Sequence, residues 1–434
     1  MIRRLMLIGS LCAFASAVAA TPARAQEVPL SQLLVDLIQS DVRLGPPGPG
    51  FPSHEAHFLP GVNQELAPYL FNQLLVAQLA TFPIGSPTGG FAFSFDAATG
   101  TFQRATNTFG PAFADRALTN GRGRVTFGAN FQYSKYSTFE GNDLDNGEVK
   151  FYLTHEDVPG NIFFEGDLVE AALSLDLTSA TTTIFANYGV TNAFDIAVAV
   201  PIVHVNMDAQ VDATVLRLAT PGQPGLHAFE GGATTAAFSE SGSATGLSDL
   251  LVRGKYRFFS GSGGGLAGGV DVRIPTGDED NLLGTGAPAV TFTLIGSSTN
   301  GRFAPHFNVG YTASGESDVV NLADEFVYKF GAEFEAAPTV TINADFLGRS
   351  LRDVGRLELT DVTHTYFNNV GVPGSTTLQE YVARSGSLNV NDLALGIKIN
   401  VAGNLLLNGN VLVALNDAGV RARVTPVFGF DYTF

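Results

Sequence analysis

The chain has 434 residues, a hydrophobic fraction of 45%, a formal net charge of −17 and a single cysteine. The acidic balance disfavours nucleic acid and other polyanions as partners, and one cysteine excludes an internal disulfide. Only 15% of the residues are charged and the mean hydropathy is +0.17, yet no run of about 18 apolar residues after the first 25 predicts a spanning helix. Such a chain is either a large soluble β protein or a membrane barrel.

The first 25 residues have the pattern of a cleaved secretory signal peptide. Arg3 and Arg4 precede an apolar run over residues 5–20, and the segment ends in Ala-Arg-Ala at 23–25. Cys12 lies inside this segment, and Leu11 before it argues against a lipoprotein signal, which needs a small residue there. The mature chain is therefore expected to begin at residue 26 and to contain no thiol.

Residues 26–121 differ in kind from the rest of the chain. Apolar residues recur at helical spacing over 30–39 and 63–79, separated by a stretch rich in Pro and Gly at 45–50. Residues 91–95 and 101–102 flank a turn-like sequence and predict a small hairpin. The segment is too irregular for a barrel wall, which leaves two interpretations: a partly helical plug in the lumen, or a periplasmic or flexible amino-terminal extension.

From residue 122 to residue 434, apolar and polar residues alternate with a period of two. Residues 125–134 show this over about ten positions, the length that a tilted strand needs to cross a bilayer. Twelve such runs follow one another: 125–134, 173–188, 194–205, 250–259, 266–274, 290–295, 303–311, 326–334, 340–346, 393–399, 405–415 and 424–434. The pattern predicts an all-β fold, an antiparallel transmembrane β-barrel of about twelve strands.

The connections between these runs alternate in length, and only the last one on the long side, at 416–420, is brief. Long connections are predicted at 139–167, 217–246, 276–287, 314–324 and 351–387, and short ones at 191–193, 260–265, 298–301, 336–338 and 402–404. Barrels with long external loops and short periplasmic turns have this parity, whereas a soluble sandwich gives no reason for it. We therefore expect a location in the outer membrane of a Gram-negative bacterium, with both ends of the sheet on the periplasmic side.

The last strand is expected to close the barrel by pairing with the one that starts near residue 122. Phe428, Phe430, Tyr432 and Phe434 share one face, which is expected to contact lipid, and Asp431 lies on the other.

Charged residues on the polar faces of the strands are candidates for lining the lumen. They are Arg253, Lys255, Arg257, Asp271 and Arg273 on one strand pair and Lys329, Glu333, Glu335, Asp345 and Arg349 on another, with His306 on the lumen face of a third strand. These side chains cannot face lipid, where a basic group costs roughly 2 to 4 kcal/mol at the midplane. Pairing with one another inside a narrow barrel is the favoured role, and steering a solute is the alternative.

Signals of catalysis or metal binding are weak. His54 and His57 are three residues apart but lie among Pro and Gly rather than on a predicted helix, and no nucleophile motif is present. Acidic clusters at 142–148 and 277–281 fit no complete calcium loop, so solvated loop residues are the favoured interpretation and a divalent-cation or lipopolysaccharide bridge is the alternative. The sequence therefore predicts a protein that is not an enzyme, without a metal or another cofactor.

Two stretches resemble a known family. Residues 249–257, followed by 272–286 with Pro275, Thr276, Gly277 and Asp278, are similar to the signature of the outer-membrane transporters named after the meta-pathway of phenol degradation. Residues 109–117 also resemble the family's stretch before its first wall strand. The resemblance implies a barrel for hydrophobic or aromatic compounds, akin to long-chain fatty-acid transporters, and it implies no settled set of substrate residues.

The sequence thus predicts a channel that passes small apolar or aromatic solutes across the outer membrane by passive diffusion. The alternatives are a non-transporting structural or adhesive surface barrel, or a general porin. Expected partners are outer-membrane lipids, the solute and the barrel assembly machinery, for which resemblance to other outer-membrane barrels implies that Phe434 is part of the insertion signal.

Overall fold

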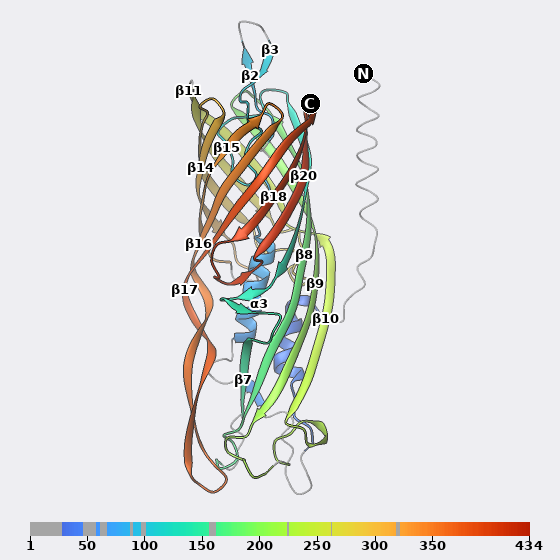
Figure 1. The fold of residues 1–434 in the computed structure, drawn as a ribbon, viewed down its shortest axis with the longest axis vertical. Coiled ribbons are helices and arrows are strands. Elements are labelled where there is room, and N and C mark those ends of the chain that lie inside the picture. The colour runs from blue at the N-terminus through green and yellow to red at the C-terminus, as the bar shows by residue number, and fades with distance from the viewer. Residues whose placement is uncertain are drawn as a thin grey trace.

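Twelve antiparallel strands close into a barrel (Figure 1). The structure is a computed structural model, and it describes residues 28–46, 58–60, 67–86, 90–96, 101–155, 162–223, 225–261, 263–317 and 322–434. The barrel strands are β4 Val125–Tyr136, β8 Leu168–Gly189, β9 Phe194–Leu216, β11 Leu250–Gly261, β12 Gly264–Ile274, β13 Ala289–Ser298, β14 Phe303–Ser314, β15 Glu325–Ala337, β16 Val340–Phe367, β17 Pro373–Ala402, β18 Leu405–Ala414 and β20 Val424–Thr433. All twelve predicted strands are present, and the predicted fold class is confirmed.

The barrel closes where the chain ends. β20 pairs antiparallel with β4, with Val427 opposite Gln132 and Thr433 opposite Thr126. The N–H of Phe434 donates to the carbonyl oxygen of Val125 at 2.8 Å. The predicted pairing of the last strand with the first wall strand is therefore confirmed.

Short turns and long connections lie at opposite ends of the barrel. The short turns are residues 190–193, 262–263, 299–302, 338–339 and 403–404, and we call this side the turn end. The other connections lie at the opposite side, the loop end, so the predicted alternation is present.

Three connections predicted as long loops contain further strands. Residues 139–167 contain β6 Asn142–Asp143 and β7 Val149–His155, with β5 Thr138–Phe139 just before them, and residues 217–246 contain most of β10 Thr235–Leu247. Residues 351–387 are largely the outer parts of β16 and β17, which pair out to Phe367 and Pro373. The prediction of loops was wrong there because the wall continues as paired strands beyond the band of outward apolar residues.

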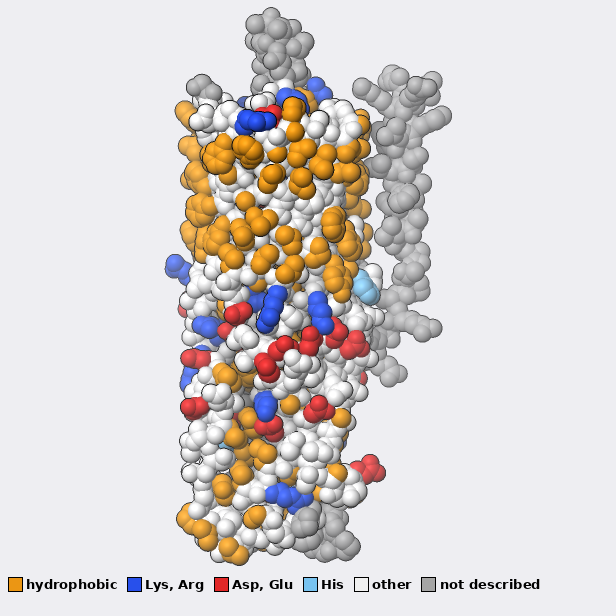
Figure 2. Space-filling model, viewed as in Figure 1, with side chains coloured by type: hydrophobic (Ala, Val, Ile, Leu, Met, Phe, Trp, Pro, Cys, Tyr) orange, Lys and Arg blue, Asp and Glu red, His pale blue; other side chains and the backbone are white. Residues whose placement is uncertain are grey.

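The side chains on both faces of β9 change in kind partway along the strand. On the outer face, Ile196, Val198, Val200 and Ile202 are followed by His204, Asn206, Asp208, Gln210 and Asp212. On the inner face, Asp195 and the small side chains of Ala197, Ala199 and Pro201 are followed by the buried Val203, Val205, Met207, Ala209 and Val211. Figure 2 shows the same division on the visible side, with a broad apolar band towards the turn end and charged side chains beyond it. An outward apolar band of this kind is typical of barrels that stand in a membrane.

Helices fill the interior at the loop end. α2 Leu30–Asp36 continues into a π-helical turn, η1 Leu37–Asp41, and α3 spans Ala67–Ala80, where helices are predicted at 30–39 and 63–79. Their buried side chains, including Leu34 and Phe71, form one hydrophobic core with the inner faces of β7, β8, β9 and the outer hairpin of β16 and β17. No helix in the described part of the chain is long and apolar enough to cross a membrane.

The remaining elements are short. β1 Phe58–Pro60 pairs with β7, β19 Val420–Arg421 pairs with β5, and η2 is Glu230–Gly232. The predicted hairpin consists of β2 Phe93–Asp96 and β3 Thr101–Arg104, which project at the turn end (Figure 1). The predicted signal peptide at 1–25 and the His54–His57 pair lie outside the described residues.

We expect the boundary of the apolar band to be measurable with one matched pair of substitutions on β9. Val198→Arg places a guanidinium in the middle of the outward apolar residues, where it should destabilise the barrel by roughly 2–4 kcal/mol in a bilayer. Asn206→Arg changes the same face of the same strand beyond the band and should cost little. The free energy of unfolding of each variant, measured by reversible unfolding in lipid vesicles, tests this difference. Equal losses of stability in the two variants would contradict a boundary of the apolar band between Val198 and Asn206.

Candidate functional site

An extended stretch before the first wall strand, residues 105–121, runs through the barrel and is bound by the wall. We call it the lumen segment. Three wall lysines donate from Nζ to its carbonyl oxygens: Lys398 to Pro111 at 2.8 Å, Lys329 to Phe113 at 2.8 Å and Lys255 to Leu118 at 2.7 Å. Because these donors lie on β17, β15 and β11, the segment is held from several sides of the barrel.

Wall carboxylates accept hydrogen bonds from the N–H groups of the same segment. Glu333 accepts from Gly110 at 2.9 Å, and Asp345 accepts from Ala112 and Phe113 at 3.1 Å each. Asp345 is fully buried, and its other oxygen lies 2.6 Å from Nε2 of His306. Gly331 makes room for this cluster, since a Cβ there would lie 2.3 Å from Oδ1 of Asp345.

Arg253 ties the lumen segment to the wall through an ion triad. Its guanidinium donates to Asp271 on β12 at 2.6 Å and to Asp115 of the lumen segment at 2.8 Å. Asn308 on β14 bonds both the N–H and the carbonyl oxygen of Asp115, at 2.6 and 2.8 Å. Asp115 is therefore bound through its side chain and through its backbone.

Two further arginines bind the carboxyl-terminal end of α3. Arg273 on β12 donates to the carbonyl oxygen of Ala80. Arg349 on β16 donates to the carbonyl oxygen and the hydroxyl of Thr81, at 3.2 and 2.8 Å, and pairs with Glu325 at 2.7 Å. Guanidinium groups suit this position because the last carbonyls of a helix lack partners and carry partial negative charge.

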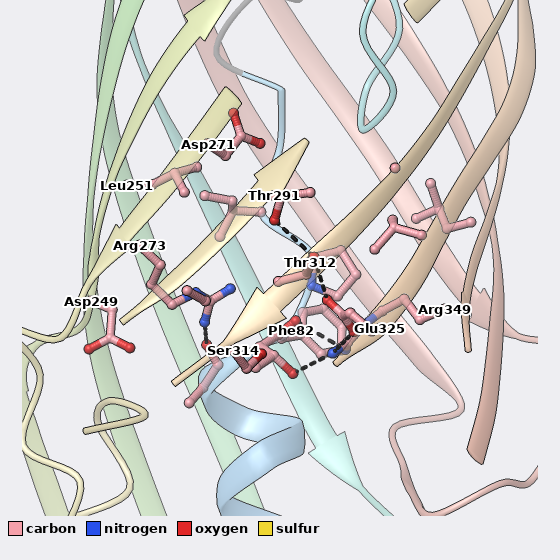
Figure 3. A pocket seen from close by; sticks show the side chains of 18 of the residues that line it. Phe82, Asp249, Leu251, Asp271, Arg273, Thr291, Thr312, Ser314, Glu325 and Arg349 are labelled. Atoms are coloured by element: carbon pink, nitrogen blue, oxygen red, sulfur yellow. Dashed lines mark hydrogen bonds and ion pairs between the residues drawn. The ribbon is translucent and has the colours of Figure 1, made fainter. Parts of the chain in front are cut away.

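A cavity of about 200 Å³, the lumen cavity, lies beside this end of α3 (Figure 3). Figure 3 shows Arg273 and Arg349 reaching into it from opposite sides. Its apolar lining includes Leu251, Val327 and Leu347. A second cavity of about 280 Å³, the outer cavity, lies between α3 and the β16–β17 hairpin. Both cavities are lined by Ala77, Thr81, Leu322, Ala323, Arg349 and Leu351, so they meet at the Arg349–Thr81 contact.

The structure gives several of the charged residues partners other than those the sequence predicts. Arg253 and Asp271 pair as expected. Arg349, however, pairs with Glu325 rather than with Glu333 or Glu335, and Lys329, Glu333 and Asp345 bond the backbone of the lumen segment. Arg257 donates to the carbonyl oxygen of Asn192 in a turn at the turn end, away from the lumen cavity.

The loop that contains Pro275, Thr276, Gly277 and Asp278 connects β12 to β13 at the loop end. The carboxylate of Asp249 accepts from the N–H of Gly277 at 3.1 Å and from the N–H and hydroxyl of Thr285 at 2.9 and 2.7 Å. The hydroxyl of Thr276 donates to the carbonyl oxygen of Ser248 at 2.8 Å. Pro275 and Asp278 are exposed, and the carbonyl oxygen of Asp280 accepts from the N–H of Ser31 in α2 at 2.9 Å. The loop therefore also holds α2.

The aromatic residues of the last strand lie on its outer face. Phe428 is 59% exposed and Phe434 55%, with Phe430 and Tyr432 between them on the same face, whereas Asp431 is buried. Among the described residues, no group of three or more His, Cys, Asp or Glu side chains could hold a metal ion.

Asp115, Lys398 and the end of α3 are site features that the sequence analysis missed. Lys398 sits on the polar face of a predicted wall strand, which is the same signal that identified Lys255. Asp115 lies in a segment without periodicity, where only its place in the stretch before the first wall strand singles it out.

Part of the chain matches a known protein family, and the barrel is similar to solved structures of outer-membrane proteins. Residues 169–351 match the family described as "Putative MetA-pathway of phenol degradation". No curated protein matches the chain. Among solved structures, the COG4313 outer membrane channel from Pseudomonas putida F1 is similar with a TM-score of 0.44 and 10% identity, over 74% of this chain and 97% of that one. A FadL homologue from Pseudomonas aeruginosa (TM-score 0.32, 11% identity) and the P. putida toluene transporter TodX (0.33, 9%) each match over 72% of this chain and 90% of theirs.

The family match runs from β8 into β16 and includes residues 249–286, on which the resemblance in the sequence rests. Residues 109–117, which also resemble the family, lie before the matched part. Over the wall from β8 into β16, the chain is therefore similar in sequence to the family described as "Putative MetA-pathway of phenol degradation".

Proposed function

We propose that this outer-membrane barrel passes small hydrophobic or aromatic compounds by passive diffusion, with the lumen cavity on their path. The observation that carries the proposal is the pair of adjoining cavities at one side of the bound lumen segment, which combine apolar side chains such as Leu251 and Val327 with polar and charged ones. Ligand sites for small molecules are concave spaces that combine apolar surface with polar groups that fix the orientation of the ligand, and these cavities offer both.

The path would run from the loop end to the turn end. A solute would enter the outer cavity, pass the Arg349–Thr81 contact and reach the lumen cavity. Beyond it, the contacts of Lys329, Asp345 and Arg253 with the lumen segment would have to loosen. Residues 26–121 would thus act as the plug of the barrel formed by residues 122–434, after removal of residues 1–25 as a signal peptide.

The orientation follows from the lengths of the connections. Outer-membrane barrels have short periplasmic turns and longer external loops. We therefore place the turn end, with both ends of the barrel sheet, in the periplasm. The contacts with the lumen segment favour a plugged transporter over a general porin, and no nucleophile motif supports an enzyme.

Uptake should depend on the space in the lumen cavity. Val327→Trp fills the cavity from β15, whereas Phe326→Trp changes the neighbouring outward side chain and leaves the cavity unchanged. We expect cells with Val327→Trp to take up labelled toluene at nearly the rate of cells lacking the protein, and cells with Phe326→Trp to match the wild type. If loss of the whole protein alters surface attachment but not uptake, a structural or adhesive barrel is the better explanation.

The plug should limit ion flow. In planar bilayers the wild-type protein should show little steady conductance, and Asp345→Ala should raise it, because two N–H groups of the lumen segment lose their acceptor at about 1.5–3 kcal/mol each. Glu333→Gln, a milder change at the same segment, should have a smaller effect in the same direction. Asp361→Ala, an exposed change on the outer part of β16, is the matched control. A large, steady conductance of the wild type would favour a general porin.

Recognition by the barrel assembly machinery should require the terminal aromatic residue. We propose that Phe428, Phe430, Tyr432 and Phe434 form the insertion signal, because they are exposed on one face of the closing strand. Deletion of Phe434 or Phe434→Asp should reduce the amount of heat-modifiable barrel in outer membranes, and Phe434→Tyr should preserve it. A normal amount of heat-modifiable protein in the deletion variant would contradict this role.

A further inference from the structure

Arg273 differs from the other arginines of the lumen cavity in its partners. It enters the cavity from β12, and its one hydrogen bond within the described part of the chain goes to the carbonyl oxygen of Ala80 (Figure 3). No carboxylate of the described residues lies within the 4.0 Å limit of an ion pair with it. A guanidinium has five N–H donors, so most of its donors remain available on the cavity side.

The other cations of the cavity have less capacity to bind an anion. Arg253 is neutralised by Asp115 and Asp271, and Arg349 by Glu325. Lys329 also has no carboxylate partner among the described residues, but its ammonium donates to the carbonyl oxygen of Phe113 and holds the lumen segment. Unlike the ammonium of Lys329, the planar guanidinium of Arg273 can bind a carboxylate through two parallel hydrogen bonds.

The space beside Arg273 suits a small apolar body. The lumen cavity has about 200 Å³, and a cavity of about 150 Å³ has room for a benzene ring. Leu251 lies on the strand next to Arg273 and directly opposite it in register, and it lines the same cavity. The cavity therefore has an apolar side chain beside a cation, and a ligand with an apolar ring and a negative charge could contact both.

We propose that the lumen cavity binds a monocarboxylate with an apolar or single-ring body, and that Arg273 binds its carboxylate. The proposal rests on the proposed transport function and names a class of solute for it. A single negative charge fits best, because the cavity is also lined by Asp249, Asp271 and Glu325, which would repel a multiply charged anion.

Binding of benzoate and of its neutral isostere benzamide tests the proposal. Calorimetry on the full-length protein in lipid nanodiscs should show tighter binding of benzoate than of benzamide. Arg273→Met should weaken benzoate binding by about tenfold or more, as expected for a lost charge-assisted contact, and should change benzamide binding by less than about twofold. Arg302→Met removes an exposed guanidinium at the turn end and should change neither affinity.

Four outcomes would overturn the proposal. Equal weakening of benzoate and benzamide in Arg273→Met would mean that Arg273 only shapes the cavity. A loss of benzoate binding in Lys329→Met but not in Arg273→Met would move the carboxylate to another cation. Benzamide and toluene binding without a preference for benzoate would overturn the carboxylate site alone, whereas failure of the wild type to bind any of the three would also count against the proposed transport function.

Discussion

The backbone of the lumen segment is the feature on which the interior of this barrel depends. A narrow barrel with polar inner faces encloses charged groups that are cut off from bulk water, and each of them needs a partner. Here many of those partners are carbonyl and N–H groups of one extended stretch. Lys255, Lys329 and Lys398 bind its carbonyl oxygens, while Glu333 and Asp345 bind its N–H groups. Wall and segment therefore satisfy each other's hydrogen-bonding groups.

At the loop end, the interior is held together mainly by packed apolar side chains. Beyond Ile202 the outer face of β9 becomes polar and its inner face carries larger apolar side chains, so the wall there encloses a hydrophobic core as a soluble protein does. That core positions α3, whose carboxyl-terminal end meets Arg273 and Arg349 at the border between the two regions. The lumen cavity lies at this border and is therefore lined both by apolar side chains and by charged ones.

The wall could be predicted from the sequence because each strand keeps a period of two and ends at a recognisable turn. Its outer extensions could be predicted only in part. The alternation expected of a lipid-facing strand ends where the outer face of β9 becomes polar, and residues 217–246 and 351–387 are predicted as loops although they contain most of β10 and the outer parts of β16 and β17. The partners of Lys329 and Asp345 were also beyond prediction. Backbone carbonyl and N–H groups occur at nearly every residue, so a contact with Phe113, more than 200 positions from Lys329, has no signature in the sequence.

The types of contact suggest how the lumen segment could move without losing its partners. A lysine that binds a carbonyl oxygen can exchange it for a neighbouring carbonyl, since every residue of the segment offers one. Asp115 is different, because Arg253 binds its side chain and Asn308 binds its backbone from both sides. Arg116 donates to Thr106 at 3.2 Å, but both residues belong to the segment, so this contact would move with it. Displacement of the segment along the barrel would thus be opposed chiefly at Asp115, which borders the lumen cavity and sets the segment's register.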